Sequence, residues 1–213
     1  MKHKNWMLFG LLGVFIVLLG CSGLREQRRA IQYFTLEYKV PKMSGQKALP
    51  AVIKVERFNV APTYNTQRMI YRDKAFKRDE YYYYKWRSNP GDTIAYLLSR
   101  DIGESGLFAA VLSNDSRFPF EFKVEGRVNE FLQKEEKDSW YADLSLTITL
   151  LKANDPDVVK RILFQKTYRA QIACPEENPQ GLAQAMSEAM KEISQEIVED
   201  VYQAVKRHMK VKK

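Results

Sequence analysis

Side chains suited to covalent or metal chemistry are scarce in this chain of 213 residues. There are two cysteines, Cys21 and Cys174, and two histidines, His3 and His208. Their wide spacing does not match the short Cys and His pairs that hold zinc, so the sequence predicts no metal site. The glycine-rich phosphate-binding motifs and the G-x-S-x-G motif of serine hydrolases are also absent from the sequence.

Carboxylates are the remaining candidates for catalysis, because the chain contains 26 Asp and Glu residues. A pair of carboxylates can act as acid and base on a glycosidic bond, and sequence alone does not show whether two of them converge. A cell-wall hydrolase therefore stays open as an alternative. Because no nucleophile, metal set or cofactor motif is recognisable, we predict that the protein is not an enzyme, has no catalytic residue and needs no cofactor.

Cys21 ends an apolar run that begins at Leu8, after a positively charged segment that includes Lys2 and Lys4. A charged start followed by a short apolar run is typical of a secretory signal peptide, and this run is too short to span a bilayer comfortably. Its last four residues, Leu-Leu-Gly-Cys, resemble the bacterial lipobox, in which the cysteine is acylated after cleavage. We therefore predict a lipoprotein signal peptide over residues 1–20 and lipidation, including palmitate, at Cys21. An uncleaved anchor and ordinary secretion are the alternatives.

The residue after Cys21 indicates in which membrane such a lipoprotein would reside. By resemblance to lipoprotein sorting, a residue other than Asp at this position, here Ser22, favours the outer membrane of a two-membraned bacterium. An anchor of three acyl chains exceeds the two-chain minimum for stable binding, since each buried CH₂ contributes roughly 0.8 kcal/mol. Residues 21–29 are then a lipidated N-terminus and a leash. We predict a protein tethered at the periplasmic face of the outer membrane.

The charge of the chain is positive but dispersed, with a formal net value of +8. Lys and Arg form no basic stripe, so we predict no nucleic-acid partner, whereas an acidic partner or anionic headgroups remain compatible. If Cys21 carries lipid, Cys174 has no partner for an intrachain disulfide. We interpret Cys174 as a small buried side chain at the end of a strand, with a reactive thiol as the alternative.

Alternation of apolar and polar residues predicts the strands that would form a sheet. The clearest case covers residues 141–152, where apolar residues at alternate positions share one face. Gly126 is expected to mark a β-bulge in a neighbouring strand. The other predicted strands include residues 30–40, 51–60, 107–112, 120–131 and 161–173.

Two Asn-Pro pairs, Asn89-Pro90 and Asn178-Pro179, predict the starts of two helices. Asn caps free amides, and Pro has the backbone angle that the first helical position needs. The second helix, expected from Pro179 to about His208, carries an apolar stripe at helical spacing. We expect this stripe to pack on the sheet, and an outward-facing stripe that binds a partner is the alternative. The stripe consists of Leu182, Met186, Met190, Ile193, Ile197, Val201 and Val205.

These elements together predict the fold class as α/β (α+β), in a single domain over residues 30–209. Its sheet is expected to be mixed and mostly antiparallel, with two main helices including the long C-terminal amphipathic one. The lipoprotein signal peptide precedes this domain, and a basic tail, residues 210–213, follows it. A chain of this length suits one domain.

Four consecutive tyrosines and a nearby tryptophan form the most unusual aromatic segment of the chain. The two-residue period of a strand sends alternate side chains to opposite faces, so these residues cannot all face one core. We predict that they form a contact face for a neighbouring subunit, a partner or lipid headgroups. A half-buried strand whose phenol hydroxyls reach water is the simpler alternative. The residues are Tyr81, Tyr82, Tyr83, Tyr84 and Trp86.

Five further segments, taken in order with the lipobox, carry a resemblance that covers almost all of the mature chain. They are Tyr33–Leu36, Val60–Asn65, Arg68–Arg72, Tyr81–Arg87 and Leu182–Ser187. Together they resemble the ABC-type transport auxiliary lipoproteins.

That resemblance implies an accessory of a mammalian-cell-entry (MCE) lipid-transport system, in which an ATPase and a permease work with MCE proteins that bridge the periplasm. It implies a non-catalytic outer-membrane component that docks or receives the MCE bridge, and a homo-oligomer for which a ring is one form. A lipoprotein that activates a cell-wall synthase, or a secretion pilot protein, is the alternative with a similar tether and domain.

Overall fold

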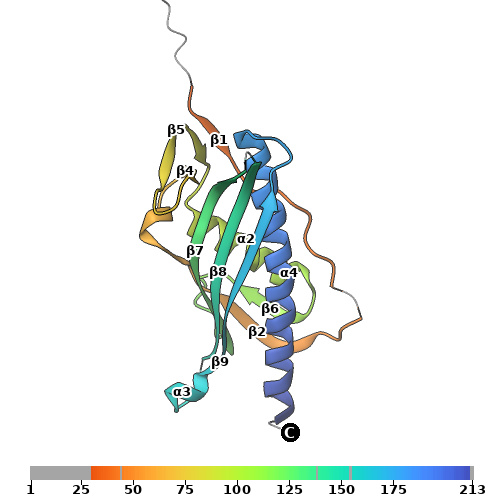
Figure 1. Cartoon of the computed structure of the whole chain (residues 1–213). Coiled ribbons are helices and arrows are strands. Elements are labelled where there is room, and N and C mark those ends of the chain that lie inside the picture. The colour runs from red at the N-terminus through yellow and green to blue at the C-terminus, as the bar shows by residue number, and fades with distance from the viewer. Residues whose placement is uncertain (1–29, 44, 138, 154, 212–213) are drawn as a thin grey trace, which may run out of the picture. The chain divides into compact units, whose positions relative to one another are not determined.

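The structure, a computed structural model, describes residues 30–43, 45–137, 139–153 and 155–211. The predicted signal peptide, Cys21 and the leash lie outside these ranges. From Ile31 onward the described residues cluster into one unit. This unit is a curled mixed sheet packed with helices (Figure 1), so the predicted α/β class and single domain are confirmed.

A long antiparallel hairpin, β7 (Phe122–Glu136) and β8 (Ser139–Lys152), forms the centre of the sheet. β9 (Ile162–Ala173) pairs with β8 along nearly its whole length, also antiparallel. The strand predicted over residues 141–152 is confirmed, because its apolar positions form a buried face against the C-terminal helix. The residues of that face are Leu144, Leu146, Ile148 and Leu150.

Shorter strands join this hairpin in parallel. β2 (Leu49–Val55), β3 (Asn59–Val60) and β4 (Arg68–Arg72) each pair with β7, and β6 (Phe108–Leu112) pairs with β2. The predicted antiparallel pairing therefore holds for the long ladders, whereas most of the short strands run parallel to their neighbours. A parallel pair needs a crossover connection, and the helix between β5 and β6 is part of one.

The first strand is shorter than predicted. β1 spans only Gln32–Phe34, rather than residues 30–40, and lies parallel to β5 (Asp79–Trp86). The chain then leaves the sheet, and residues 35–43 and 45–48, here called the strap, run beside the C-terminal helix (Figure 1). Alternate strap residues still point inward, as the sequence pattern indicates, but they pack against helices instead of joining a ladder.

The strand predicted over residues 51–60 is divided into β2 and β3. Between them Phe58 turns into the core, where its ring lies 2.2 Å from the position that a Cβ on Gly126 would occupy. Gly126 itself pairs regularly with Ile148, and the irregularity in this ladder falls after Val128. The predicted bulge at Gly126 is therefore wrong, because the missing side chain makes room for the Phe58 ring.

Two capped helices start where the Asn-Pro pairs predict. In α2 (Pro90–Glu104), the Asn89 side chain accepts a hydrogen bond from the Gly91 amide at 3.0 Å. In α4 (Pro179–Val211), the Asn178 side chain accepts one from the Gly181 amide at 2.8 Å. A 3-10 turn, η1 (Pro62–Tyr64), and a one-turn helix, α3 (Val158–Arg161), lie in connections.

The apolar stripe of α4 faces inward, as predicted. All seven of its residues are buried, and α4 packs against β8, β9 and α2. The helix continues to Val211, past the predicted end near His208. Within the described ranges, no helix combines the length and the apolar character that crossing a bilayer requires.

Hydrogen bonds fix the strap along α4, in the same direction as the helix. The Glu37 amide donates to Ser187 Oγ at 3.0 Å, near the start of the helix. Further along, the Tyr202 hydroxyl donates to the Lys47 carbonyl at 2.9 Å. The N-terminal part of the domain is thus held by its last helix.

A buried carboxylate joins the strap to both main helices. Asp101 of α2 is 1% exposed and accepts hydrogen bonds from the hydroxyls of Tyr38, at 2.7 Å, and Ser194. Its other oxygen lies 2.7 Å from Arg100 Nη2, and this guanidinium stacks over the Tyr38 ring. Burial and the adjacent carboxylate raise the pKa of Tyr38 well above its ordinary value, so its hydroxyl remains a donor.

Candidate interaction surfaces

The four tyrosines of β5 lie in an irregularity of the β4–β5 hairpin. Arg68 pairs with Lys85 and Ile70 pairs with Glu80, so the single residue Met69 stands opposite Tyr81–Tyr84. An excess of residues on one strand bends it and releases its side chains from strict alternation. The expectation of two tyrosines on each face holds by number but not by alternation: Tyr81 and Tyr84 pack together against the core, and Tyr82 and Tyr83 contact each other outside it.

Three of the predicted contact residues, Trp86, Tyr81 and Tyr84, are engaged within the domain. Trp86 is 4% exposed and packs edge-on against Phe131, with ring centroids 5.0 Å apart. Tyr81 is half-buried, and its hydroxyl donates to Gln133 Oε1 at 2.9 Å. Burial raises the pKa of Tyr81 to about 12. The prediction that Trp86 belongs to a contact face is corrected, because its side chain lies in the core.

The exposed part of the aromatic segment is centred on Tyr82, which is 66% exposed. Its ring lies 4.8 Å from that of the half-buried Tyr83 and 5.8 Å from the Arg68 guanidinium. Tyr33 of the neighbouring β1 is also exposed, and the Arg87 guanidinium covers its ring at 4.7 Å. Aromatic rings with cationic partners therefore occupy the surface of β1 and β5.

The turn between β4 and β5 presents an aromatic side chain that the sequence reasoning missed. Phe76 has an exposed fraction of 106%, which is that of a side chain without a packing partner. Its φ is 62°, a left-handed conformation that is unfavourable for a bulky residue. The neighbouring Lys77 is paired with Asp79 at 2.6 Å and with Asp73 at 3.4 Å. A lone aromatic residue within a charged turn is the sequence signal that could have identified it.

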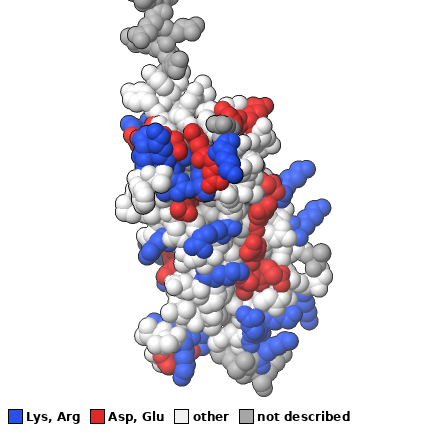
Figure 2. Space-filling view, viewed as in Figure 1, with Lys and Arg blue, Asp and Glu red and all other residues white. Residues whose placement is uncertain are grey.

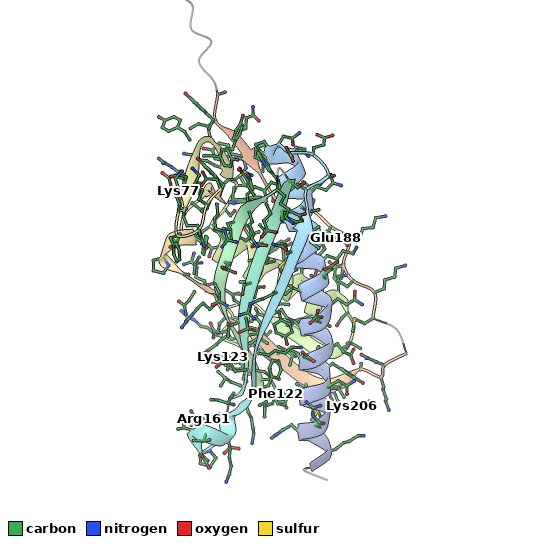
Figure 3. All side chains as sticks on the ribbon, viewed as in Figure 1. Lys77, Phe122, Lys123, Arg161, Glu188 and Lys206 are labelled. Atoms are coloured by element: carbon green, nitrogen blue, oxygen red, sulfur yellow. The ribbon has the colours of Figure 1, made fainter. Side chains whose placement is uncertain are left out.

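Phe76 and the entry of the chain into β1 share one end of the domain. Tyr71 pairs with Gln133 near the end of β7, so the β4–β5 turn projects beyond that end of the sheet. Gln32 pairs with Tyr84, so Ile31 precedes β1 on the same side. We call this region the β1 end; Figure 3 labels Lys77 there. Its exposed apolar residues are Ile31, Tyr33, Phe76 and Tyr82.

The opposite end of the sheet carries a second exposed apolar group, around α3. Val159 is 79% exposed, and Val158, Ile162 and Phe118 are also largely exposed. We call this region the α3 end. Charged side chains of both signs lie around it: Figure 3 labels Lys123 and Arg161 at this end, and Lys152 and Lys160 pair with Asp155 and Asp157. Figure 2 shows further Lys and Arg near the C-terminal part of α4.

A surface cleft of about 610 Å³ lies where β2 and β6 end beside α2. Arg57 and Asp92 meet in it through two hydrogen bonds, Nε to Oδ1 at 2.6 Å and Nη2 to Oδ2 at 3.0 Å. Pairing with Asp92 raises the pKa of Arg57 further above its ordinary value, so the guanidinium stays charged. The exposed ring of Tyr96 forms part of the wall. The cleft is therefore lined by both polar and apolar side chains, and the Arg57 guanidinium in it is already paired with Asp92.

Cys174 lies just after β9, as predicted, and is half-buried. Its amide donates to the Trp140 carbonyl at 2.7 Å. Burial and the Glu177 carboxylate raise the pKa of the Cys174 thiol to about 11, so the thiol is protonated near neutral pH and is a poor nucleophile. In the part of the chain that the structure describes, no three His, Cys, Asp or Glu residues converge as metal ligands.

Comparisons with known proteins give the following similarities. A family model described as "ABC-type transport auxiliary lipoprotein component" matches residues 34–198, from the end of β1 into α4. The crystal structure of protein XCC0632 from Xanthomonas campestris is similar, with a TM-score of 0.76 and 16% identity over 84% of this chain and 99% of that one. The hypothetical protein CT253 from Chlamydia trachomatis has a TM-score of 0.55 and 12% identity, over 74% and 98%. These two structures show the same fold. No curated protein matches the chain.

Proposed function

The chain belongs to the family of ABC-type transport auxiliary lipoprotein components, and from this premise we propose that it is a non-catalytic, lipid-anchored accessory of an MCE-type lipid transporter. The observation that carries the proposal is the family match, which spans most of the sheet, all of α2 and the larger part of α4. ATP chemistry would belong to a partner protein.

The proposed anchor is an acylated Cys21, after removal of residues 1–20. The sequence of residues 1–21 supports this anchor: a positively charged segment is followed by an uninterrupted apolar run that ends in Gly20-Cys21. Ser22 supports the outer membrane as the location, with the domain on the periplasmic side. The domain would then be available to a protein that reaches the outer membrane from the inner one.

The α3 end is our proposed docking surface for the MCE protein. Protein interfaces combine an apolar centre with a polar rim, and here Phe118, Val158 and Val159 are exposed at an end that also carries paired charged residues. This end lies away from the entry of the chain at β1 (Figure 1). A partner that approaches from the periplasm would meet it first if the anchor holds the other end at the membrane.

Purification of the acylated protein from membranes that contain the transport system tests this proposal. We expect the MCE protein to co-purify, together with the ATPase and the permease. Val159→Asp should reduce the recovered MCE protein, because it places a carboxylate at the apolar centre. Tyr96→Ala is the matched control, since Tyr96 is also exposed but lies at the α2 cleft.

Other results would exclude the proposal. Recovery of a cell-wall synthase in place of the MCE protein would support the activator alternative, and lytic activity of the purified protein on peptidoglycan would support a hydrolase. Self-association is also part of the proposal, and native mass spectrometry of the acylated protein in detergent measures the number of subunits.

A further inference from the structure

The apolar residues of the β1 end leave much of their side-chain surface exposed. Phe76 projects from a turn with its whole side chain exposed and its backbone in the left-handed region. Glycine would adopt this conformation without strain, so folding alone does not favour phenylalanine there. Tyr82 and Ile31 add exposed apolar surface at the same end. Exposed apolar side chains gathered at one end of a domain mark a site of contact with an apolar surface outside it.

The length of chain before β1 limits which end can face the membrane, and this step rests on the proposed anchor at Cys21. About ten residues lead from Cys21 to Ile31, and they span at most about 36 Å when fully extended. α4 has 33 residues and is therefore about 50 Å long. The strap bonds to α4 near its start, at Ser187, so β1 lies toward the N-terminal end of that helix. If the α3 end faced the bilayer, Ile31 would stand beyond the reach of the anchor.

The side chains of the β1 end match the interface of a phospholipid bilayer. Tyrosine and phenylalanine partition into the headgroup region, and Lys and Arg extend to the phosphates while their stems cover apolar surface. Lys74 and Lys77 lie on either side of Phe76 in the turn, and Arg68 and Arg87 lie over Tyr82 and Tyr33. Arg68 also pairs with Glu80, so Lys74 and Arg87 are the cations at this end for which we invoke the lipid phosphates. The acidic residues of the turn are partly neutralised, since Asp73 and Asp79 both pair with Lys77.

We propose that the β1 end is a bilayer-contact surface on which Phe76 inserts at the boundary between headgroups and acyl chains, with Tyr82 and Tyr33 beside it. The anchor and the turn then hold the domain at two points. A lipid-anchored protein with this second contact has a defined orientation on the membrane, with the α3 end directed away from it.

The test uses a tryptophan placed at the turn of the acylated, full-length mature protein. Phe76→Trp is reconstituted into vesicles of phosphatidylethanolamine and phosphatidylglycerol, with or without lipids brominated in the acyl chains. Subtraction of the unsubstituted protein removes the emission of the native tryptophans. We expect the added tryptophan to emit at shorter wavelength in vesicles and to lose most of its emission to brominated lipid. Folding should not suffer, because the Phe76 side chain is fully exposed.

Tyr96→Trp and Val159→Trp are the matched controls, since both positions are exposed but lie elsewhere. Neither should be quenched by brominated lipid. Absence of quenching in the Phe76→Trp protein, or equal quenching in the Val159→Trp protein, would overturn the proposal. A concentration-dependent blue shift of Phe76→Trp in detergent, with no quenching in vesicles, would instead identify a contact between copies of the chain and would also overturn it.

Mass spectrometry of the same samples separates this inference from the proposed function. Acylated protein that shows no quenching overturns the insertion and leaves the anchor intact. Quenching of Phe76→Trp in a Cys21→Ser protein supports the insertion even if the acyl anchor is refuted. Recovery of the MCE protein is measured independently of either result.

Discussion

The Tyr38 hydroxyl donates a hydrogen bond to the Asp101 carboxylate at 2.7 Å, although 63 residues separate the two in sequence. Ser194 of α4 donates to the same oxygen, and Arg100 pairs with the other one. One buried carboxylate thus connects the strap, α2 and α4. Such a group contributes to stability only while its partners remain in place.

Replacement of Asp101 should therefore be strongly destabilising. Asp101→Ala leaves the Tyr38 and Ser194 hydroxyls and the Arg100 guanidinium without their shared acceptor, which should lower the free energy of unfolding by about 3 to 5 kcal/mol. Urea denaturation monitored by circular dichroism measures this change. The control is Glu104→Ala, at an exposed position of the same helix, for which we expect a change below about 0.5 kcal/mol. Similar values for both variants would contradict the importance of the cluster.

A carboxylate in the buried stripe of α4 should unfold the domain. Ile193 is buried against the sheet, so Ile193→Asp places an unpaired charge in an apolar environment, which costs several kcal/mol against a total stability of about 5 to 15. Gln195→Asp introduces the same group on the exposed side of the helix and should leave the melting temperature nearly unchanged. A folded Ile193→Asp protein with a native circular dichroism spectrum would refute the packing of α4.

Gly126 should tolerate no side chain while Phe58 stays in the core. A Cβ at this position would lie 2.2 Å from the Phe58 ring, so Gly126→Ala must displace that ring and should cost about 1 to 3 kcal/mol. Gly103→Ala is the control, because its nearest neighbour would be at 3.8 Å, in ordinary contact. Combining Gly126→Ala with Phe58→Ala should cost less than the sum of the two single changes. Additive losses would show that the two residues do not share this space.

Ionisation of the Cys174 thiol should lower the free energy of unfolding in alkaline solution. Its pKa is about 11 in the folded protein, above the ordinary value of 9.0. Between these values the unfolded thiol loses its proton while the folded one keeps it, so rising pH favours the unfolded state. Below about pH 9 the thiol is protonated in both states and this contribution is constant. The difference in unfolding free energy between the native protein and Cys174→Ala should thus shrink from pH 8 to pH 11. A constant difference would argue against the shifted pKa.

Sequence periodicity predicted the elements whose pattern directly reflects burial. The stripe of α4 and the alternation in β8 each place one face against the core, so period and structure agree. The strap shows the limit of this reasoning: Leu36 and Tyr38 alternate inward as in a strand, yet their extended chain packs against helices. Periodicity reports which side is buried and does not report whether a neighbouring strand is present.

Only part of the aromatic surface was predicted, because periodicity also does not report the register of neighbouring strands. Strict alternation along Tyr81–Tyr84 assumes a regular ladder, and the β4–β5 register removes that condition, so Tyr81 meets Tyr84 and Tyr82 meets Tyr83. Trp86 lies in the core because it pairs with Phe34 of β1 and packs on Phe131, contacts between segments far apart in sequence. The exposure of Phe76 was not predicted, because a lone aromatic residue marks a charged turn as unusual but does not indicate how far its side chain projects.

The strap also constrains the order in which the chain can fold. The Lys47 carbonyl accepts its hydrogen bond from Tyr202, a residue 155 positions later. A ribosome releases residues 35–48 early, yet their packing surface exists only once α4 has emerged, and contacts so distant in sequence form slowly. We therefore expect a newly made chain to stay open until synthesis is almost complete. An open chain is the form that a protein-conducting channel can thread, so late closure of this domain would suit the export that we propose.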